Sequence, residues 1–432
     1  MVAVDEVRKE VWHGTMVVDW QGRLDVDRMR RERFAKAQAA MKERGMAALV
    51  AMIPANKRYT TGVRSGIHTG AGESFSLVFA EGQLEDSIVY EEATTWVPEH
   101  EHITWIKPEN HRPFHSHWSH GTGTAFYEWW VKELASKVRE DLRERKLEKE
   151  KLGVDSLGAG IRAAFEALNI TVVDAFDMMM ETRSIKTEDE IYCMKMAGAI
   201  VDIAFAEMIE ALRPGRRENE ISAIGHAALL RNGAEAVGAV SVRSGPNTAP
   251  NYLGRMPTDR IIQPGDLVFW DIFGARYLGY HTCYYRTFKV GTKPTQQEKD
   301  WYKKTRDMLY EAVAVLKDGI TTADVAAKWP EASYWGRGHE MLVSGDALGH
   351  GQGLGQYEYP VITRDNSLRF PQPIKKNMTI AMETWFGQTD TEHGWRGGCR
   401  LENVWLITEK GHENLYAMPD EEIICPPHAI YV

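Results

Sequence analysis

The chain has 432 residues, of which 43% are hydrophobic and 26% charged, and a formal net charge of −9. This length suffices for two or three domains with separate cores. The negative charge disfavours a nucleic-acid partner and permits a cationic substrate. No apolar run reaches the roughly 18 residues of a membrane span, and four dispersed cysteines are typical of reduced thiols, so we expect a cytoplasmic protein without membrane contact.

The first part of the chain alternates strand-like and helix-like segments. Apolar residues at three- and four-residue steps predict helices over 26–45, 126–146 and 159–168. Short apolar runs predict strands at 47–52, 76–79, 87–90, 153–155 and 171–174. The polar segment 56–62 is expected to be a loop. Residues 1–178 are therefore expected to form an α/β domain with a mixed sheet.

A histidine-rich stretch interrupts this alternation. Its histidines are His100, His102, His111, His115, His117 and His120. Proline and glycine in the stretch predict a long loop, and the histidine spacing matches no zinc-binding pattern. We expect a lid or a contact with a partner subunit here rather than a metal site.

The second part of the chain predicts helices around an antiparallel sheet. Thr187 and Glu190 have the spacing of a capping box, which marks a helix start. Further helices are expected at 218–231 and 295–317, and strands at 239–243, 378–386 and 399–407. With a hairpin between them, these elements predict an α+β domain with a curved antiparallel sheet over residues 179–432.

Separated fragments of this second part carry acid, base and thiol groups. Their chemically active residues are Asp271, His281, Cys283, His350, Glu383 and Glu402. The first three belong to the hairpin, His350 lies in what we expect to be a Gly-rich loop, and the two glutamates lie in expected strands. Because side chains two apart in a strand share a face, His281 and Cys283 are expected to point the same way.

In order and spacing these fragments resemble the metal-ligand set of the pita-bread peptidases, which include methionine aminopeptidase, aminopeptidase P and prolidase. In that family two Asp, one His and two Glu hold two metal ions. The segments GHGQG at 349–353 and EYP at 358–360 are similar to the family's GHGxG…HExP, and GCRLEN at 398–403 is similar to its G-x-R-x-E-D. The resemblance covers about 180–415 well, and 26–175 more weakly in the manner of the creatinase and prolidase N-terminal domain.

The chain also departs from the pattern of the active peptidases. Cys283 stands where the family has its second Asp ligand, and Tyr357 stands where it has a catalytic His. Pro250-Asn251-Tyr252 occupies the place of a further His. In these departures the chain resembles divergent members of the fold: creatinase, ectoine hydrolase and the pita-bread dimethylsulfoniopropionate lyases. The resemblance implies a hydrolase or lyase that cleaves a C–N or C–S bond in a small zwitterionic metabolite.

The catalytic residues are expected to be His350, Asp271, Glu383 and Glu402. His350 is the acid/base candidate, because the pKa of histidine lies nearest to neutral. With one family acid lost, too little negative charge remains to offset two dications, so we expect no metal cofactor. The alternative is one divalent ion, Mn, Fe, Co or Zn, held by these same four residues.

Other residues are expected to contact the substrate. Aromatic side chains beside the motifs can add cation–π attraction to a cationic group. Arg64 is expected to hold a substrate carboxylate, because creatinase-like enzymes bring such a loop over a neighbouring subunit's site, which also implies a homodimer. The substrate-contacting set is Trp270, His281, Cys283, Tyr357, Glu358, Trp385 and Arg64.

Two other functions stay open at this point. One is a metal-dependent Xaa-Pro aminopeptidase or dipeptidase with altered ligands. The other is a catalytically inactive pita-bread module that binds a peptide or protein. The sequence neither names the substrate nor distinguishes hydrolysis from elimination.

Overall fold

The computed structural model describes residues 23–64, 74–92, 103–115, 123–248, 256–389 and 396–429. They form two compact units, one of Asp25–Arg183 and one made mostly of the residues from Ser184 onward. The division into independent domains after residue 178 stays a prediction. Within the described ranges, no helix is both long enough and apolar enough to cross a membrane.

The N-terminal unit is built on a six-stranded mixed sheet with the strand order β4-β3-β2-β1-β5-β6. Its strands are β1 Ala48–Ala51, β2 Phe75–Phe79, β3 Ile88–Glu92, β4 His111–Phe114, β5 Leu152–Val154 and β6 Val172–Asp174. Its helices are α2 Val26–Glu43, α3 Pro54–Thr61, α5 Thr124–Glu144, α6 Ala159–Glu166 and α7 Phe176–Ser184. The α/β class expected for this part is confirmed.

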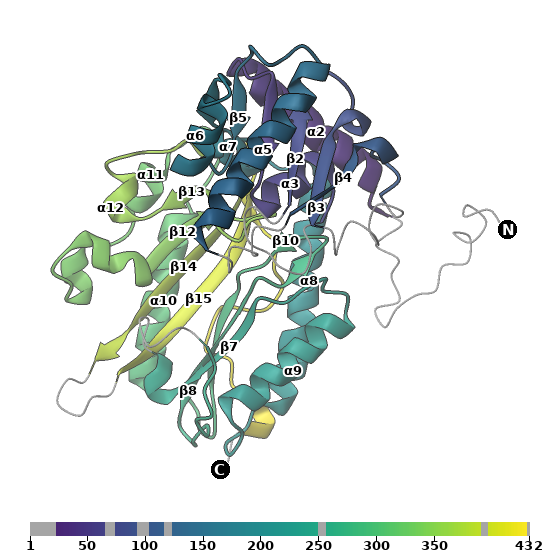
Figure 1. The fold of residues 1–432 in the computed structure, drawn as a ribbon. Coiled ribbons are helices and arrows are strands. Elements are labelled where there is room, and N and C mark those ends of the chain that lie inside the picture. Colours follow the sequence, from purple (N-terminus) through teal and green to yellow (C-terminus); the bar gives the residue numbers. More distant parts are fainter. Residues whose placement is uncertain are drawn as a thin grey trace. The chain divides into compact units, whose positions relative to one another are not determined.

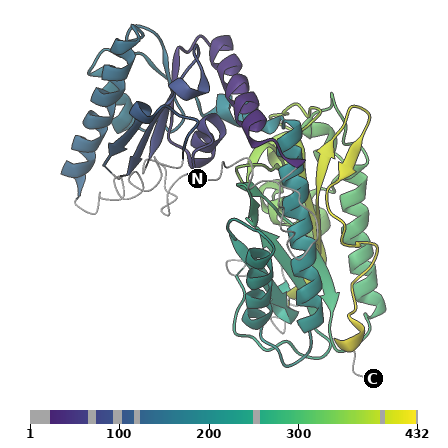
Figure 2. The same cartoon turned by 90° about the vertical axis from the view of Figure 1, so that its right-hand side faces the viewer.

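Helices cover both faces of this sheet, with α2 and α5 on opposite sides (Figure 2). One face packs its buried strand residues against Trp130, Leu134 and Val138 of α5. Apolar residues at three- and four-residue steps thus form one buried stripe, as the periodicity predicts. Strand β4 starts at His111, inside the stretch that we expected to be a long loop.

Segment 56–62 is the main error of the sequence analysis in this unit, because it belongs to helix α3 and not to a loop. Pro54 occupies the first turn of the helix, and Gly62 ends it in a left-handed conformation with φ 75°. The hydroxyl of Thr60 donates to the carbonyl of Asn56 at 2.9 Å. Such a bond to the carbonyl four residues back slightly weakens a helix, so backbone bonds such as that from the Gly62 amide to the Arg58 carbonyl at 2.9 Å hold the segment helical.

The C-terminal unit contains a three-stranded and a five-stranded antiparallel sheet, with orders β11-β8-β7 and β13-β12-β14-β15-β16. The strands are β7 Ala239–Ser244, β8 Leu267–Phe273, β9 Arg276–Tyr277, β10 Tyr280–His281, β11 Tyr285–Lys289, β12 Ala347–Gly351, β13 Glu358–Ile362, β14 Thr379–Thr389, β15 Arg396–Ile407 and β16 His412–Asn414. The helices are α8 Glu188–Ala211, α9 Glu218–Arg231, α10 Gln296–Val313, α11 Thr322–Ala326 and α12 Arg364–Ser367.

Helices α8 and α9 lie side by side next to the three-stranded sheet, and α10 packs across β14 and β15 (Figure 1). The expected α+β class is confirmed. The capping box is also confirmed, since Thr187 is the N-cap of α8 and its side chain accepts from the Glu190 backbone. Helix α9 has the predicted bounds, because its apolar stripe and the Asn232-Gly233 stop are both local signals.

The two sheets of this unit meet where β11 runs beside β15. The hydroxyl of Thr287 donates to the carbonyl of Arg400 at 2.8 Å and accepts from its amide at 2.9 Å. The guanidinium of Arg286 donates to the carbonyl of Glu402 at 2.8 Å. These bonds bring the hairpin of β8 and β11 against the strands that carry the two glutamates.

Candidate metal centre

The two glutamates lie directly opposite each other on neighbouring strands. Glu383 of β14 pairs with Glu402 of β15 in the antiparallel register. Both are buried, and Arg400 Nη1 lies 3.6 Å from a carboxylate oxygen of Glu383. Among the residues that the structure describes, neither carboxylate accepts a hydrogen bond of normal geometry. Two buried acids with unfilled acceptor positions are typical of a site built for a cation.

His350 stands beside these acids on strand β12. It pairs with Ala381 of β14, two residues from Glu383 and therefore on the same face of the sheet. Its Nδ1 lies 3.0 Å from the carbonyl oxygen of Gly351, which fixes the ring with Nδ1–H as the donor. Its Nε2 lies 3.9 Å from an oxygen of Glu402. A metal-binding histidine commonly has this arrangement, with one nitrogen held by a carbonyl and the other facing the ion.

The expected Gly-rich loop around His350 is wrong, because these residues form an inner strand and the His350 side chain is 0% exposed. The glycines are needed for close packing. A Cβ on Gly349 would lie 2.6 Å from the sulfur of Met382, and one on Gly351 would lie 2.2 Å from the carbonyl oxygen of Tyr359. Glycine here lets the neighbouring groups approach the strand backbone, rather than making it flexible.

Asp271 and Cys283 reach the cluster from the other sheet. Asp271 lies on β8, opposite Tyr285 of β11, and Cys283 comes two residues before β11 begins. The sulfur of Cys283, a ring nitrogen of His350 and a carboxylate oxygen of Glu402 lie within 4.8 Å of one another. All three side chains are buried. The hairpin therefore contributes donors to the same site as β12 and β15.

The cluster is crowded with negative charge. Burial, then the charges of Glu383 and Asp271, raise the pKa of Glu402 well above its ordinary value, while Arg400 acts in the opposite direction. Burial and the nearby carboxylates, with Glu402 first, likewise raise the pKa of the Cys283 thiol well above its usual range. Glu383 and Glu402 face each other across the strand pair, and the charge of Asp271 adds to theirs. A divalent cation among them would offset this repulsion.

The donor set fits one transition-metal ion. It combines carboxylates, an imidazole and a thiol, and the donor atoms of Cys283, His350 and Glu402 lie within 4.8 Å of one another. Such mixed oxygen, nitrogen and sulfur sets suit zinc, iron or cobalt. The residues that would hold such an ion are drawn from Asp271, Cys283, His350, Glu383 and Glu402.

Of the aromatic residues in the expected substrate-contacting set, Tyr357 and Trp385 lie beside residues of the cluster, whereas Trp270 faces away from it. The ring of Tyr357 lies 4.4 Å from that of His350 and is half exposed, and its contact with a substrate stays a prediction. Trp385 is on the same face of β14 as Glu383 and donates its indole N–H to the carbonyl of Thr248 at 3.0 Å. Trp270 alternates with Asp271 and so faces away from the cluster, where its ring packs 3.9 Å from that of Phe288. We therefore propose no substrate contact for Trp270.

Of the remaining members of that set, Cys283 belongs to the donor cluster, and the other three have the following surroundings. Glu358 is buried and accepts from Lys186 Nζ at 2.7 Å, which gives it a structural partner. The amide of His281 donates to the carbonyl of Gly353 at 2.9 Å. Arg64 is an exposed residue of the N-terminal unit. The substrate-binding roles of Glu358, His281 and Arg64 stay predictions.

Some of the residues discussed in the sequence analysis fall outside the described residues. These are the Pro250-Asn251-Tyr252 segment and, from the histidine-rich stretch, His100, His102, His117 and His120. A lid or partner-contact role for that stretch stays a prediction.

Arg400 is the residue of this site that sequence reasoning missed. Besides its ion pair with Glu383, its guanidinium lies 4.9 Å from the centre of the Tyr285 ring and donates to the carbonyl of Gly345 at 2.7 Å. The signal was present, because Arg400 comes two residues before Glu402 and must share its face of the strand.

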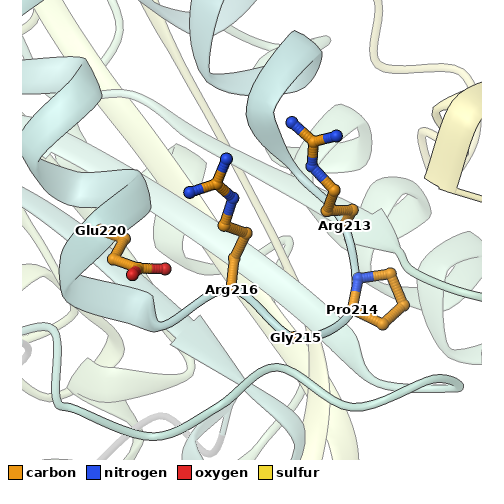
Figure 3. Close-up of a pocket in the computed structure, with 5 residues that line it drawn as sticks. All are labelled: Arg213, Pro214, Gly215, Arg216 and Glu220. Atoms are coloured by element: carbon orange, nitrogen blue, oxygen red, sulfur yellow. The ribbon is translucent and has the colours of Figure 1, made fainter.

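A separate surface pocket of about 420 Å³ lies at the turn between α8 and α9. It is lined by Arg213, Pro214, Gly215, Arg216 and Glu220, and the side chains of the two arginines extend to the same side (Figure 3). None of its residues belongs to the donor cluster, so this pocket is not part of the candidate centre.

Residues 192–409, half of the chain, match the profile of metallopeptidase family M24. The chain belongs to this family. It is 30% identical over 261 residues to the probable dipeptidase PepE of Mycobacterium tuberculosis, a match that covers 60% of this chain and 66% of that protein. It is 31% identical over 242 residues to the Xaa-Pro dipeptidase of Pyrococcus furiosus, covering 55% of this chain and 65% of that protein. Each match thus spans just under two thirds of the relative.

Solved structures show the same fold. The dipeptidase PepE from Mycobacterium ulcerans superposes with a TM-score of 0.71 at 23% identity, covering 93% of this chain and 99% of that one. The X-Pro aminopeptidase from Thermotoga maritima superposes with a TM-score of 0.69 at 20% identity, covering 92% of this chain and 99% of that one. The M24 chain described here therefore has the pita-bread fold that its motifs indicated.

These findings correct two expectations. The small-zwitterion hydrolase or lyase is wrong, because the family is one of metallopeptidases and the relatives are named as dipeptidases. The expectation of no metal cofactor is wrong for the same reason. The first error came from weighing the lost histidines too heavily, and the second came from counting carboxylates alone. In the fold, Cys283 lies next to His350 and Glu402, so a count of carboxylates leaves out one potential donor atom.

Proposed function

We propose that this M24 chain is a metal-dependent peptidase that hydrolyses short peptides, with Xaa-Pro dipeptides as the first substrates to test. One observation carries the proposal: Asp271, His350, Glu383 and Glu402, which are far apart in the sequence, meet in one buried cluster with a ring nitrogen turned toward a carboxylate. Membership of a metallopeptidase family and likeness to named Xaa-Pro dipeptidases support it.

The residues of the cluster would have different roles in hydrolysis. Asp271, His350, Glu383 and Glu402 would hold the divalent ion, which when bound supplies Lewis-acid polarisation of the scissile carbonyl and an activated water. The half-exposed Tyr357, against the ring of His350, can donate its hydroxyl to the bound peptide in the place of the family's histidine.

The test is hydrolysis of a panel of dipeptides, Xaa-Pro against Xaa-Ala, by protein loaded in turn with Zn²⁺, Mn²⁺, Co²⁺ or Fe²⁺. Release of free proline is measured with and without a chelator. Glu383→Gln should lower kcat/KM at least about 100-fold, since it weakens a metal ligand. Glu210→Gln, at an exposed position of α8, is the matched control and should leave kcat/KM unchanged.

Three outcomes separate the alternatives. Chelator-sensitive proline release that Glu383→Gln removes would support the proposal. Full activity in Glu383→Gln would refute the assignment of the centre. Stoichiometric metal without hydrolysis of any peptide would instead favour an inactive module that binds peptides. We also propose a homodimer in the cytoplasm, and light scattering coupled to gel filtration measures the oligomeric state.

A further inference from the structure

We propose that the Cys283 thiolate is itself a ligand of the metal ion in this centre, and that it makes the site selective for thiophilic ions such as Zn²⁺ and Co²⁺ over Mn²⁺. The inference rests on the proposed function, because it concerns the identity of the ion that the peptidase would use. It deepens that function by assigning a metal ligand, Cys283, at a position where the peptidases that this chain resembles have an Asp.

The first support is geometric. Nε2 of His350 and the nearer oxygen of Glu402 are 3.9 Å apart. The Cys283 sulfur lies within 4.8 Å of a ring nitrogen of His350 and of a carboxylate oxygen of Glu402. Bonds of about 2.0–2.1 Å to nitrogen and oxygen and about 2.3 Å to sulfur place tetrahedral ligand atoms roughly 3.4–3.6 Å apart. The three atoms therefore need only small side-chain rotations to bind one ion.

The second support is that the backbone on both sides of Cys283 is held in place. The carbonyl of Thr282 accepts from the Gly274 amide at 2.9 Å, and the carbonyl of Tyr284 accepts from the Ile272 amide at 3.1 Å. These bonds pin the segment to the end of β8, the strand that carries Asp271. The sulfur is thus presented to the cluster by a rigid hairpin, which is how a ligand is preorganised.

The third support comes from comparing the cysteines. Cys399 is also fully buried, yet it packs in an apolar cluster with Leu267 and Trp301, as a structural cysteine should. Cys283 is buried against carboxylates instead, with Glu402 the strongest of its charged neighbours. An apolar side chain or an alanine would fill this space without placing a polarisable sulfur among acids. The surroundings of Cys283 are those of a ligand.

Ligand softness then decides which ion is favoured. A thiolate discriminates strongly for zinc, cobalt and iron, whereas manganese and magnesium favour sets of carboxylates and water. With Cys283 in the set, the site joins one soft donor to an imidazole and carboxylates. Replacing the thiol by a carboxylate in Cys283→Asp should therefore shift the preference toward Mn²⁺. We expect the ratio of Zn²⁺ to Mn²⁺ affinity to fall at least about tenfold.

The experiment is a spectroscopic titration of chelator-treated protein with Co²⁺. Sulfur bound to cobalt gives a charge-transfer band in the near ultraviolet, and the band should saturate at one equivalent in the natural protein. Cys283→Ser should lose the band. Cys425→Ser, at a half-buried thiol outside the donor cluster, is the matched control and should keep it. Circular dichroism checks that both variants are folded.

X-ray absorption of the zinc-loaded natural protein provides a second measurement that needs no variant, and it should show a sulfur scatterer at about 2.3 Å. One equivalent of bound cobalt or zinc without a sulfur signal would overturn the thiolate inference and leave the proposed peptidase intact. Failure of the natural protein to bind any divalent ion would overturn the proposed function and the inference together. A band that persists in Cys283→Ser would show that another cysteine binds the ion.

Discussion

The buried ion pair of Lys186 and Glu358 offers the sharpest test of how the centre is supported. Lys186 Nζ lies 2.7 Å from Glu358, and their side chains are 1% and 0% exposed. A Cβ on Gly353 would lie 2.6 Å from the Glu358 carboxylate, so the pair packs directly beneath the turn that follows His350. Lys186→Met leaves this buried carboxylate without the Lys186 ammonium, while the Gly355 amide still donates to it at 2.8 Å.

Breaking a buried pair from one side costs about 3–5 kcal/mol, because the desolvated carboxylate loses the ammonium group that offset its charge. Lys195→Met is the matched control. Its ion pair with Glu413 has the similar separation of 2.8 Å, but the side chains are 42% and 49% exposed, and such pairs contribute about 0–1 kcal/mol. The difference between the two variants should therefore be at least about 2 kcal/mol.

Hydrogen exchange, read on peptides from β12 and β13, is the suitable assay, because a chain with two units need not unfold in a single step. Adding Glu358→Gln to Lys186→Met should recover part of the loss, since no uncompensated charge then remains buried. If Lys186→Met comes within about 1 kcal/mol of the Lys195→Met control, the ion pair is not a support of the site and the reasoning fails.

Three further predictions concern other parts of the chain. His350→Ala should abolish peptide hydrolysis and weaken metal binding at least about tenfold, which metal titration checks. It should also lower the melting temperature, measured by calorimetry, because removing a fully buried side chain leaves a cavity. Gly351→Ala should destabilise the protein by about 1–3 kcal/mol, since its Cβ would lie 2.2 Å from the Tyr359 carbonyl oxygen, whereas Gly411→Ala has no atom within 4 Å and should be near neutral in the same denaturation assay. Burial raises the pKa of Asp155 in the N-terminal unit to about 6, so the stability that this group contributes is present below its unfolded pKa and is lost, by up to about 3 kcal/mol, as pH rises from about 4 to about 6. Asp155→Asn should flatten that slope, and an unchanged slope in pH-dependent unfolding would show that another group titrates.

The outline of the fold could be predicted because its signals are local. The capping box at Thr187, the stripe of α9 and the strands that carry Glu383 and Glu402 all follow from residues within a few positions of one another. Helix α3 was missed because its polar composition resembles that of a loop. What makes it helical is its proline start, its glycine end and bonds within its own backbone.

The site was predicted less completely, for a different reason. The order of the motifs named Asp271, His350 and the glutamates, but it could not show that Glu383 and Glu402 stand opposite each other or that Cys283 belongs with them. Those facts depend on strand register and on how two sheets meet, which no short window of sequence contains. The glycines around His350 misled for the same reason, since the atoms that require them come from other strands.

The opposition of Glu383 and Glu402 has a consequence for how the protein is produced. Like charges directly opposite each other on paired strands weaken a sheet, so the two glutamates lower the stability of the folded chain unless a cation offsets their charge. An ion that binds only the folded chain adds RT ln(1 + [ion]/Kd) to its stability, about 2.7 kcal/mol at one hundred times Kd. Metal supply would then increase the fraction of chains that are folded. Protein made in metal-poor medium should be recovered in lower yield and with greater sensitivity to proteases.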